Sequence, residues 1–536
     1  MRGRTIAITS VAVVVVAGAA GGGAWYLLHT RGTPQETAQR FAAAWTKGDM
    51  AAMKAELAAP PSGDFDAAYA ELTKNLNATA VDVKLGQITA NGDDKATAAY
   101  TATAALKNVG DWTYTGTIDL TVADRHWRVD WSPAAVHPSL TGANHLKLKT
   151  TWPNRAAVTD SGGTRIDGSD VGGSVQQLVG YLDKATQKDV KKLGPAYRTG
   201  QAIGRGGLQE TFQKRLAGTP TTEVMAGEES LTTIEGTDGK AVATTLDLNV
   251  QQAAANAVRD MEKPTSLVAI RPSTGEILAV VNNQGGFNRA LDGRYAPGST
   301  FKTVTAAGLL AAGVNPADQV TCPKNANVGG LKIRNSDHAA YGTLSFLDSY
   351  AHSCNTTFAP LTKQHLSAKA LYDTATALGF NQPLNIGVPA TKASMPRATS
   401  DAELAAESFG QAKITASPLV MASVAAAIAD GSWRPPTLVP NLKQKATEQA
   451  LPDGVAEQLR AMMRAVVTKG TAQAAGLPDG TYGKTGTAEF GTGPELESHA
   501  WFHGFKGDLA FAVVVEGGGG GGKIAAPVAA QFLNGL

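Results

Sequence analysis

The sequence has 536 residues, of which 43% are hydrophobic and 18% are charged, and its formal net charge is +2. This length is too great for one core and predicts about three domains. Because positive and negative charges nearly balance, the sequence has no large excess of positive charge to bind a polyanion, and we expect no nucleic-acid partner. The sequence has two cysteines and no Cys-x-x-Cys or His-Glu-x-x-His spacing, and it therefore predicts no metal site and no cofactor.

The first 31 residues have the pattern of a membrane anchor. An uncharged run from Thr5 to Leu28 follows Arg2 and Arg4, and as a helix its 24 residues would span about 36 Å, enough to cross a bilayer. The arginines favour a cytoplasmic N-terminus, which places the remainder of the chain outside the cell membrane. A cleaved signal peptide is the alternative, because Ala17-Gly18-Ala19 consists of small residues. The length of the run favours a single-pass anchor over residues 1–31.

Helix patterns followed by strand patterns make up residues 32–138. Thr33-Pro34-Gln35-Glu36 is a capping box with proline in the first turn, and it opens an amphipathic helix with Phe41 and Trp45 on one face. Two more helices and then four strands are predicted, at Met50–Leu57, Phe65–Leu76, Val81–Ala90, Ala96–Leu106, Trp112–Val122 and His126–Trp131. This order is typical of an α+β domain, which we interpret as a spacer.

Two further domains are predicted after the spacer. Residues 139–243 are rich in glycine and interrupted by turns, and residues 244–536 hold the remaining long helix and strand patterns. In the last domain, Ser266–Arg271 and Glu276–Asn282 form a predicted hairpin around Pro272–Gly275. We expect a mainly antiparallel sheet flanked by helices, with a buried helix after Ser299 at its centre.

A candidate nucleophile and base lie in this last domain. Pro297 and Gly298 break the preceding segment, and Ser299 is expected to open a helix that carries Lys302. Residues three apart share a helix face, so the hydroxyl and the amine can meet. The lysine can accept the serine proton only if burial or positive neighbours lower its pKa. A lone Ser-x-x-Lys also arises by chance, as a helix cap with a solvated lysine.

Two more motifs raise the specificity of the pattern. Ser353-Cys354-Asn355 follows a helical stretch at a turn, and Lys484-Thr485-Gly486-Thr487 lies in a strand-like segment. Ser-x-x-Lys, Ser-x-Asn and Lys-Thr-Gly in this order form the motif set of penicillin-binding proteins and serine β-lactamases. Each motif alone has a plainer explanation, since Ser353 and Asn355 could cap a helix and Lys484 could be solvated. Together they indicate a catalytic site.

On these motifs the chain resembles a class B penicillin-binding protein. The resemblance implies a multidomain α+β fold, with a transmembrane helix and a transpeptidase domain like that of serine β-lactamases. Residues 32–138 are similar in pattern to the cone-like N-terminal domain of the methicillin-resistance penicillin-binding protein. Residues 155–163 and 205–218 are similar to two stretches of the pedestal (dimerisation-type) domain.

The resemblance also implies roles for the motif residues. Ser299 would attack the penultimate D-alanine of a peptidoglycan stem peptide with Lys302 as base, and Ser353 would relay a proton to the leaving amine. Asn355 would hold the substrate backbone. Lys484 and the hydroxyls of Thr485 and Thr487 would bind the terminal carboxylate, and Gly486 would let the substrate approach the strand. The product would be a cross-link between stem peptides, and penicillin would inhibit the enzyme covalently.

Alternatives and partners follow from the same resemblance. The chain could be a β-lactam sensor or β-lactamase, or an inactive cell-wall scaffold. A sensor of the membrane type would carry several apolar spans, and a scaffold would have lost a motif residue; the sequence has neither property. Expected partners are stem peptides ending in D-Ala-D-Ala, β-lactams and a glycosyltransferase. The sequence leaves open a role in elongation, division or sporulation.

The two cysteines allow two interpretations. Cys322 and Cys354 could form a disulfide if the domain lies in an oxidising compartment. A disulfide requires Cα atoms within about 7 Å, which a separation in sequence does not reveal. Two separate thiols are therefore the favoured interpretation.

Overall fold

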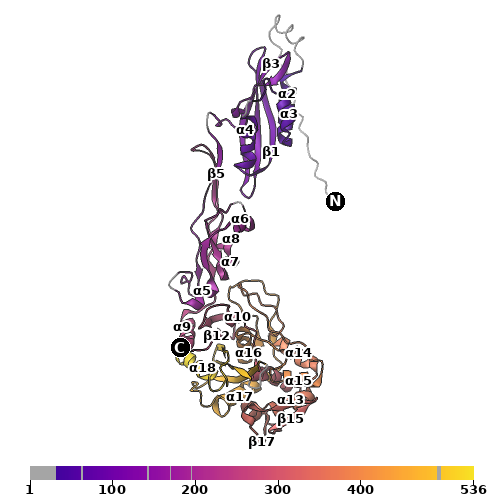
Figure 1. Ribbon diagram of the computed structural model, residues 1–536, viewed down its shortest axis with the longest axis vertical. Helices are drawn as coiled ribbons and strands as arrows, with labels where there is room; N and C mark the ends of the chain where they lie inside the picture. Colours follow the sequence, from indigo (N-terminus) through magenta and orange to yellow (C-terminus); the bar gives the residue numbers. More distant parts are fainter. Residues whose placement is uncertain (1–31, 62–63, 142–143, 169–170, 195, 492–495) are drawn as a thin grey trace. The chain divides into compact units, whose positions relative to one another are not determined.

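The computed structural model describes residues 32–61, 64–141, 144–168, 171–194, 196–491 and 496–536. The chain divides into two units (Figure 1). The N-terminal unit contains residues up to 153 together with 186–199 and 218–237, and the C-terminal unit contains 154–185, 200–217 and 238–536. The predicted anchor, 1–31, lies outside the described residues. Within the described residues, every helix is too short or too polar to cross a bilayer.

The N-terminal unit begins with three helices and continues as an antiparallel sheet, as predicted. Its elements are α2 (Pro34–Lys47), α3 (Met50–Ala55), α4 (Phe65–Lys74), β1 (Ala78–Ala90), β2 (Lys95–Leu106), β3 (Gly110–Ala123) and β4 (His126–Val129). The strands pair in sequence order, and α2 packs against β1. The capping box is confirmed, because Glu36 N donates to Thr33 Oγ1 (3.2 Å) and Thr33 N donates to Glu36 Oε2 (3.1 Å). Phe41 and Trp45 are buried in the core.

The segment predicted as the 139–243 domain contributes to both units. Strands β5 (Leu146–Thr151), β9 (Thr221–Ala226) and β10 (Glu229–Ile234) form a sheet in the N-terminal unit, which also holds α6 (Gln187–Leu193). The remaining elements belong to the C-terminal unit: β6 (Val158–Thr159), α5 (Gly173–Val179), β7 (Tyr181–Lys184), β8 (Ala202–Arg205), α7 (Gly207–Thr211), α8 (Gln213–Ala217) and β11 (Val242–Ala243). The boundaries 139 and 243 stay a prediction.

The two glycine-rich stretches noted in this segment contact each other in the C-terminal unit. Arg155 Nε donates to Gln209 Oε1 (2.8 Å), and Ala156 N donates to Leu216 O (2.9 Å). Gln209 Nε2 in turn donates to Asp167 Oδ2 (2.9 Å). These bonds connect two chain segments that are about fifty residues apart, so both stretches contribute to packing.

A five-stranded sheet is the core of the C-terminal unit. Its strands, in spatial order, are β13 (Ile277–Asn282), β12 (Thr265–Ile270), β22 (Leu509–Val515), β21 (Glu497–Lys506) and β20 (Tyr482–Phe490), and all neighbours pair antiparallel. Strands β12 and β13 are buried along their whole length, because α9 (Leu248–Val258), α16 (Pro418–Asp430) and α18 (Ala525–Asn534) pack on the sheet. The predicted antiparallel sheet and the β12–β13 hairpin are therefore confirmed.

Further helices and small hairpins complete this unit (Figure 1). The helices are α10 (Arg289–Asp292), α11 (Lys302–Ala311), α12 (Phe346–Ala351), α13 (Asn355–His365), α14 (Ala368–Ala377), α15 (Asp401–Glu407) and α17 (Val455–Thr468). The hairpins pair β14 (Gln319–Cys322) with β17 (Gly342–Ser345), β15 (Asn325–Val328) with β16 (Leu331–Arg334), and β18 (Ser432–Trp433) with β19 (Gln449–Ala450). Helix α11 is buried from Lys302 to Leu310, as its apolar composition predicts.

The structure modifies the predicted start of this helix. Ser299 lies in a short 3₁₀ turn, Gly298–Phe301, and α11 begins only at Lys302. Gly298 has φ +52°, and a Cβ there would lie 2.7 Å from Thr487 O. The tight turn thus depends on a residue without a side chain, and it brings the nucleophile close to strand β20.

Candidate active site

The three motifs meet in one cleft of the C-terminal unit. Ser299 comes from the 3₁₀ turn, Ser353 from the turn before α13, and Thr485 and Thr487 from β20; all four line a cavity of about 500 Å³. Ser299 and Thr487 also line an adjoining cavity of about 260 Å³, together with Asn355. The candidate nucleophile is therefore accessible from two sides.

Lys302 is the most highly connected side chain of the cleft. It is fully buried, and its Nζ lies 3.0 Å from Ser299 Oγ and 3.2 Å from Ser353 Oγ. The Nζ also donates to Ser353 O (2.8 Å) and to Asn355 Oδ1 (2.5 Å). Burial, and secondarily the charge of Lys484, holds the pKa of Lys302 well below its usual range. The amine is thus both in contact with the hydroxyl and able to exist unprotonated.

Lys484 approaches the same serine from β20. Its Nζ donates to Ser353 Oγ (2.8 Å) and to Thr485 O (3.0 Å), and the side chain is fully buried. Burial lowers the pKa of Lys484 to about 7. Ser353 therefore bridges two lysines, and hydrogen bonds run without a gap from Ser299 through Lys302 and Ser353 to Lys484.

Ser353 and its neighbours are held in an unusual backbone geometry. Ser353 has φ +61°, in the left-handed region that residues with a side chain rarely adopt. Such a conformation costs about 1–3 kcal/mol and persists only where the surroundings impose it. One constraint is Asn355 at the start of α13, whose Nδ2 donates to Arg334 O on β16 (2.9 Å).

The second constraint is a disulfide, which corrects the favoured interpretation of two separate thiols. Cys322 on β14 is bonded to Cys354, and their Cα atoms are 6.0 Å apart. The sequence could not reveal this pairing, because 32 residues separate the cysteines and only the packing of β14 against α13 brings them together. The middle residue of the second motif is thereby tied to a neighbouring hairpin.

Strand β20 presents the third motif at the edge of the sheet. Thr485 Oγ1 is hydrogen-bonded to Thr471 Oγ1 (2.5 Å), and Gly521 N donates to Thr487 Oγ1 (3.4 Å). A Cβ at Gly486 would lie 2.9 Å from Thr300 and 3.0 Å from both Pro297 O and Trp501. Because Gly486 has no side chain, the turn that carries Ser299 can approach β20 closely. Gly486 therefore helps to set the distance between the first and third motifs.

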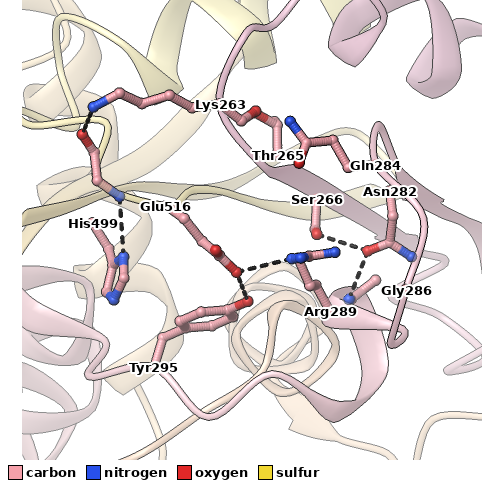
Figure 2. Close-up of polar contacts among 12 residues, drawn as sticks. Lys263, Thr265, Ser266, Asn282, Gln284, Gly286, Arg289, Tyr295, His499 and Glu516 are labelled. Carbon is pink, nitrogen blue, oxygen red and sulfur yellow. Dashed lines mark hydrogen bonds and ion pairs between the residues drawn. The ribbon is translucent and has the colours of Figure 1, made fainter.

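A polar network holds the segment that leads into the nucleophile turn (Figure 2). The Tyr295 hydroxyl donates to the Glu516 carboxylate, which also accepts from Arg289 Nε (3.0 Å). Burial, followed by the adjacent Glu516, raises the pKa of Tyr295 above its ordinary value, which keeps the hydroxyl protonated. The tyrosine ring packs edge-on against His499 at 5.1 Å.

Two hydrogen bonds made by backbone groups of Ala296 and Gly298 complete this anchoring. Trp501 Nε1 donates to Ala296 O (3.1 Å), and Gly298 N donates to Gly410 O (3.0 Å). The Phe409-Gly410-Gln411 segment thus lies directly against the turn. Sequence reasoning missed Tyr295 and Glu516, since 221 residues separate the two and neither belongs to a motif.

Sequence reasoning also missed four charged residues at the cleft. Arg334 and Glu489 line both cavities, Asp337 lines the larger one, and Lys523 lines the larger one beside the glycine run 519–522. Glu489 could have been noticed because it follows the Lys-Thr-Gly-Thr motif by two residues, the period of a strand face. Arg334 and Lys523 carry no comparable signal in the sequence.

Comparison with known proteins agrees with this geometry. The family model described as penicillin-binding protein transpeptidase domain matches residues 265–534, and the model described as NTF2-like N-terminal transpeptidase domain matches residues 33–144. The peptidoglycan D,D-transpeptidase PbpA of Mycolicibacterium smegmatis is 33% identical over 379 residues, covering 60% of this chain and 73% of that protein. Penicillin-binding protein 3 of Bacillus subtilis is 25% identical over 402 residues, covering 64% and 58%.

Solved structures show the same fold. Pseudomonas aeruginosa PBP2, solved in complex with WCK 5153, has a TM-score of 0.63 and 25% identity, covering 72% of this chain and 96% of that one. Penicillin-binding protein A of Mycobacterium tuberculosis, solved as a ceftriaxone acyl-enzyme, has a TM-score of 0.57 and 24% identity, covering 71% and 98%. The transpeptidase model alone matches 270 of the 536 residues (265 to 534), and its range contains all three motifs. The chain belongs to the penicillin-binding protein transpeptidase family, with a mixed α/β transpeptidase fold and an NTF2-like N-terminal domain.

Proposed function

We propose that the protein is a serine D,D-transpeptidase that cross-links peptidoglycan stem peptides and is acylated by penicillin. The observation that carries this proposal is the unbroken chain of hydrogen bonds from Ser299 to Lys302, Ser353 and Lys484 in a cleft of about 500 Å³. The name of the Mycolicibacterium smegmatis relative, a peptidoglycan D,D-transpeptidase, supports the same reaction.

In the acylation step, Lys302 acts as the base. Its unprotonated Nζ takes the proton of Ser299 Oγ while the oxygen attacks the carbonyl carbon of the penultimate D-alanine. The proton passes by way of Ser353 to the departing amine of the terminal D-alanine, and the C–N bond breaks. The lowered pKa of Lys302 supports this role, because an ordinary lysine is protonated at neutral pH.

Binding of the donor uses the third motif. Protonated Lys484 and the hydroxyls of Thr485 and Thr487 bind the terminal carboxylate, a charge-assisted contact. The backbone N–H groups of Ser299 and Thr487 stabilise the oxyanion, and such a donor contributes about 3 kcal/mol in other acyl transferases. The edge position of β20 supports this arrangement, since the free edge of a sheet can pair with an extended peptide.

Release of the acyl group requires an amine from a second stem peptide. The acceptor nitrogen attacks the ester carbonyl, the bond to Ser299 Oγ breaks, and the proton of the amine returns to that oxygen by way of Lys302. Penicillin supplies no acceptor amine and keeps its leaving group tethered, so its adduct persists. We therefore favour a transferase over an efficient β-lactamase.

The finer organisation is part of this proposal. We infer that residues 1–31 anchor the protein with a cytoplasmic N-terminus, and that the cone-like NTF2-like domain and the pedestal segment hold the catalytic domain away from the membrane surface. The Arg2 and Arg4 bias and the apolar run after it support the topology. Cross-linking needs glycan chains as substrate, so we also propose a glycosyltransferase partner. One structural neighbour comes from a peptidoglycan synthase complex in which polymerization and crosslinking are coordinated.

Labelling with a fluorescent penicillin tests the proposal. The wild-type protein is expected to label with a stoichiometry of about one, and Ser299→Ala is expected to abolish labelling because the variant lacks the attacking oxygen. Ser349→Ala is the matched control, since it removes a buried hydroxyl that has no hydrogen-bond partner among the described residues. Stoichiometric labelling of the Ser299→Ala protein would show that another residue is the nucleophile. Full turnover of the adduct within seconds would instead identify a β-lactamase.

A further inference from the structure

One face of strand β20 carries three side chains along the cleft. Thr485, Thr487 and Glu489 alternate with inward-packed residues, and all three line the larger cavity. Because side chains two apart share a strand face at about 6.6 Å spacing, Glu489 lies one step beyond Thr487 in the direction away from Lys484. Glu489 and Thr487 also line the smaller cavity.

Glu489 has a partner on the opposite wall of the cleft. Arg334 Nη2 on β16 is 3.0 Å from Glu489 Oε1, and each side chain is about half exposed, 51% and 46%. The backbone of Arg334 is fixed by the active site, because its carbonyl accepts from Asn355 Nδ2. Both residues line both cavities, and both cavities include Ser299. The ion pair therefore crosses the cleft beside the nucleophile.

The direction of the donor peptide places its upstream residues at this ion pair. This step rests on the proposed function, in which the terminal carboxylate binds at Lys484, Thr485 and Thr487 and the acyl carbon lies at Ser299. A donor that pairs with the edge of β20 then extends from Thr487 toward Glu489, at the residue spacing of a strand. The residue that precedes the two D-alanines comes to lie between Glu489 and Arg334.

We propose that Arg334 and Glu489 form a subsite for the side-chain end of that upstream residue, and that the subsite selects an end bearing both an ammonium and a carboxylate group. Stem peptides that form cross-links carry a side-chain amine, because the acceptor strand needs one. Glu489 binds the ammonium and Arg334 binds a carboxylate on the same carbon. The zwitterion replaces the ion pair charge for charge, whereas a simple amine leaves Arg334 without its counter-ion.

The energetics of the pair suit this exchange. An exposed ion pair is weak, because water screens both charges and two long side chains lose freedom, so a ligand can open it at little cost. The contacts that replace it are charge-assisted hydrogen bonds made inside a cleft, and the fork of the arginine matches a carboxylate in two-point geometry. Selectivity then comes from the contact between Arg334 and the carboxylate, which a donor with a plain amine cannot make.

Acylation by three penicillins tests the subsite, because the acyl side chain of a penicillin takes the place of the donor's upstream residues. The first penicillin has an α-aminoadipyl side chain, which ends in a zwitterion; the second has that end carboxylate converted to an amide; the third has the uncharged phenylacetyl group. For the wild type we expect the zwitterionic compound to acylate Ser299 about tenfold faster than its amide, the effect of one charge-assisted contact. Second-order rate constants are measured by intact-protein mass spectrometry.

Substitutions separate the two halves of the subsite. Arg334→Gln is expected to slow only the zwitterionic penicillin, to the rate of its amide. Glu489→Gln is expected to slow both amine-bearing compounds about fivefold, and both variants should react with the phenylacetyl compound at the wild-type rate. Arg271→Gln and Glu276→Gln are matched controls, because these residues form an Arg–Glu pair on the β12–β13 hairpin. They should leave all three rates unchanged.

Two results would overturn the inference. One is a wild-type protein that reacts equally fast with the zwitterionic penicillin and its amide. The other is an Arg334→Gln protein that reacts more slowly with all three penicillins in equal proportion, which would mean that the pair only maintains the shape of the cleft. Neither result touches the proposed function, which fails only if Ser299→Ala still labels.

Discussion

Two buried groups of side chains differ in how their polar atoms are hydrogen-bonded: the lysine pair of the C-terminal unit, Lys302 and Lys484, and the tyrosine cluster of the N-terminal unit, Tyr100 and Tyr114. Lys302 and Lys484 are 0% exposed, and each amine has hydrogen-bond partners from at least two residues. In the tyrosine cluster, Tyr100 donates to two backbone carbonyls, whereas the hydroxyl of Tyr114 is buried with no partner among the described residues.

The two regions meet the cost of burying polar atoms in different ways. Burying an ammonium costs several kcal/mol even when it is paired, and a buried lysine avoids this cost when it loses its proton. An unpaired hydroxyl costs about 1–3 kcal/mol, which the burial of an aromatic ring offsets at about 1.5–3 kcal/mol. The tyrosines are therefore explained by packing alone. The lysines are not, because burial lowers the pKa of both amines, and this supports a role for them in proton transfer beside Ser299.

Replacing the candidate base should give the largest effect. Lys302→Met keeps most of the length of the side chain and removes the amine, so acylation by penicillin should fall by about 10³-fold or more, as general-base catalysis is lost. The far-ultraviolet circular dichroism should not change, because an apolar chain replaces a buried polar one. The rate is measured by fluorescent penicillin labelling over hours. A rate within tenfold of wild type would place the base elsewhere.

The pH dependence of acylation should separate the two lysines. Lys302 must be unprotonated, so the rate rises with pH as its lowered pKa is passed. Lys484 must be protonated to bind a carboxylate, and its pKa is about 7, so the rate falls above neutral pH. We expect a bell-shaped profile whose alkaline side declines about tenfold per pH unit at its limit.

Lys484→Arg tests the assignment of the alkaline side. Arginine stays protonated throughout this range, so the decline above pH 7 should disappear even if the maximal rate is lower. An alkaline decline that persists in this variant would belong to another group.

Glu407, at the end of α15, is another buried titratable group of the C-terminal unit, and it differs from the two lysines in its hydrogen bonding. Both carboxyl oxygens are without a hydrogen-bond partner among the described residues, and burial, followed by the charge of Glu403, raises the pKa to about 7. A raised pKa stabilises the folded state at pH values below the unfolded pKa, and this contribution is lost as pH rises through about 7.

Glu407→Gln keeps the side chain neutral at every pH. The variant should exceed the wild type in unfolding free energy by about 1–3 kcal/mol at pH 8 and should differ little at pH 5. Calorimetric melting of both proteins at the two pH values measures this. An equal difference at pH 5 and pH 8 would mean that the carboxyl group does not titrate in this range.

The smallest effects are expected in the tyrosine cluster. Tyr100→Phe removes a hydroxyl with two acceptors and should destabilise the N-terminal unit by about 1–1.5 kcal/mol. Tyr114→Phe removes a hydroxyl without a partner among the described residues and should be neutral or slightly stabilising. Denaturant melts followed by tryptophan fluorescence compare the two. Equal destabilisation would show that the Tyr114 hydroxyl also makes a hydrogen bond in solution.

Local sequence patterns were sufficient to predict most helices and strands and to single out the candidate motif residues. The capping box, the helices followed by a meander, the 266–282 hairpin and the strand bearing Lys484 all depend on neighbouring residues, so turn residues and hydrophobic period predicted them. The predicted ends of elements in the N-terminal unit differ from the observed ends by a few residues, since the last turn of a helix or the last pair of a strand depends on its packing.

Sequence patterns therefore predict the candidate catalytic residues, whereas long-range packing sets the positions of those residues. The Cys322–Cys354 disulfide, the bond from Tyr295 to Glu516 and the Arg334–Glu489 pair join residues 32, 221 and 155 positions apart. No local preference encodes such contacts, because they exist only after the sheet and its surrounding helices have packed. The same packing removes water from Lys302 and Lys484, and this desolvation, which no motif expresses, lowers the pKa values of both amines.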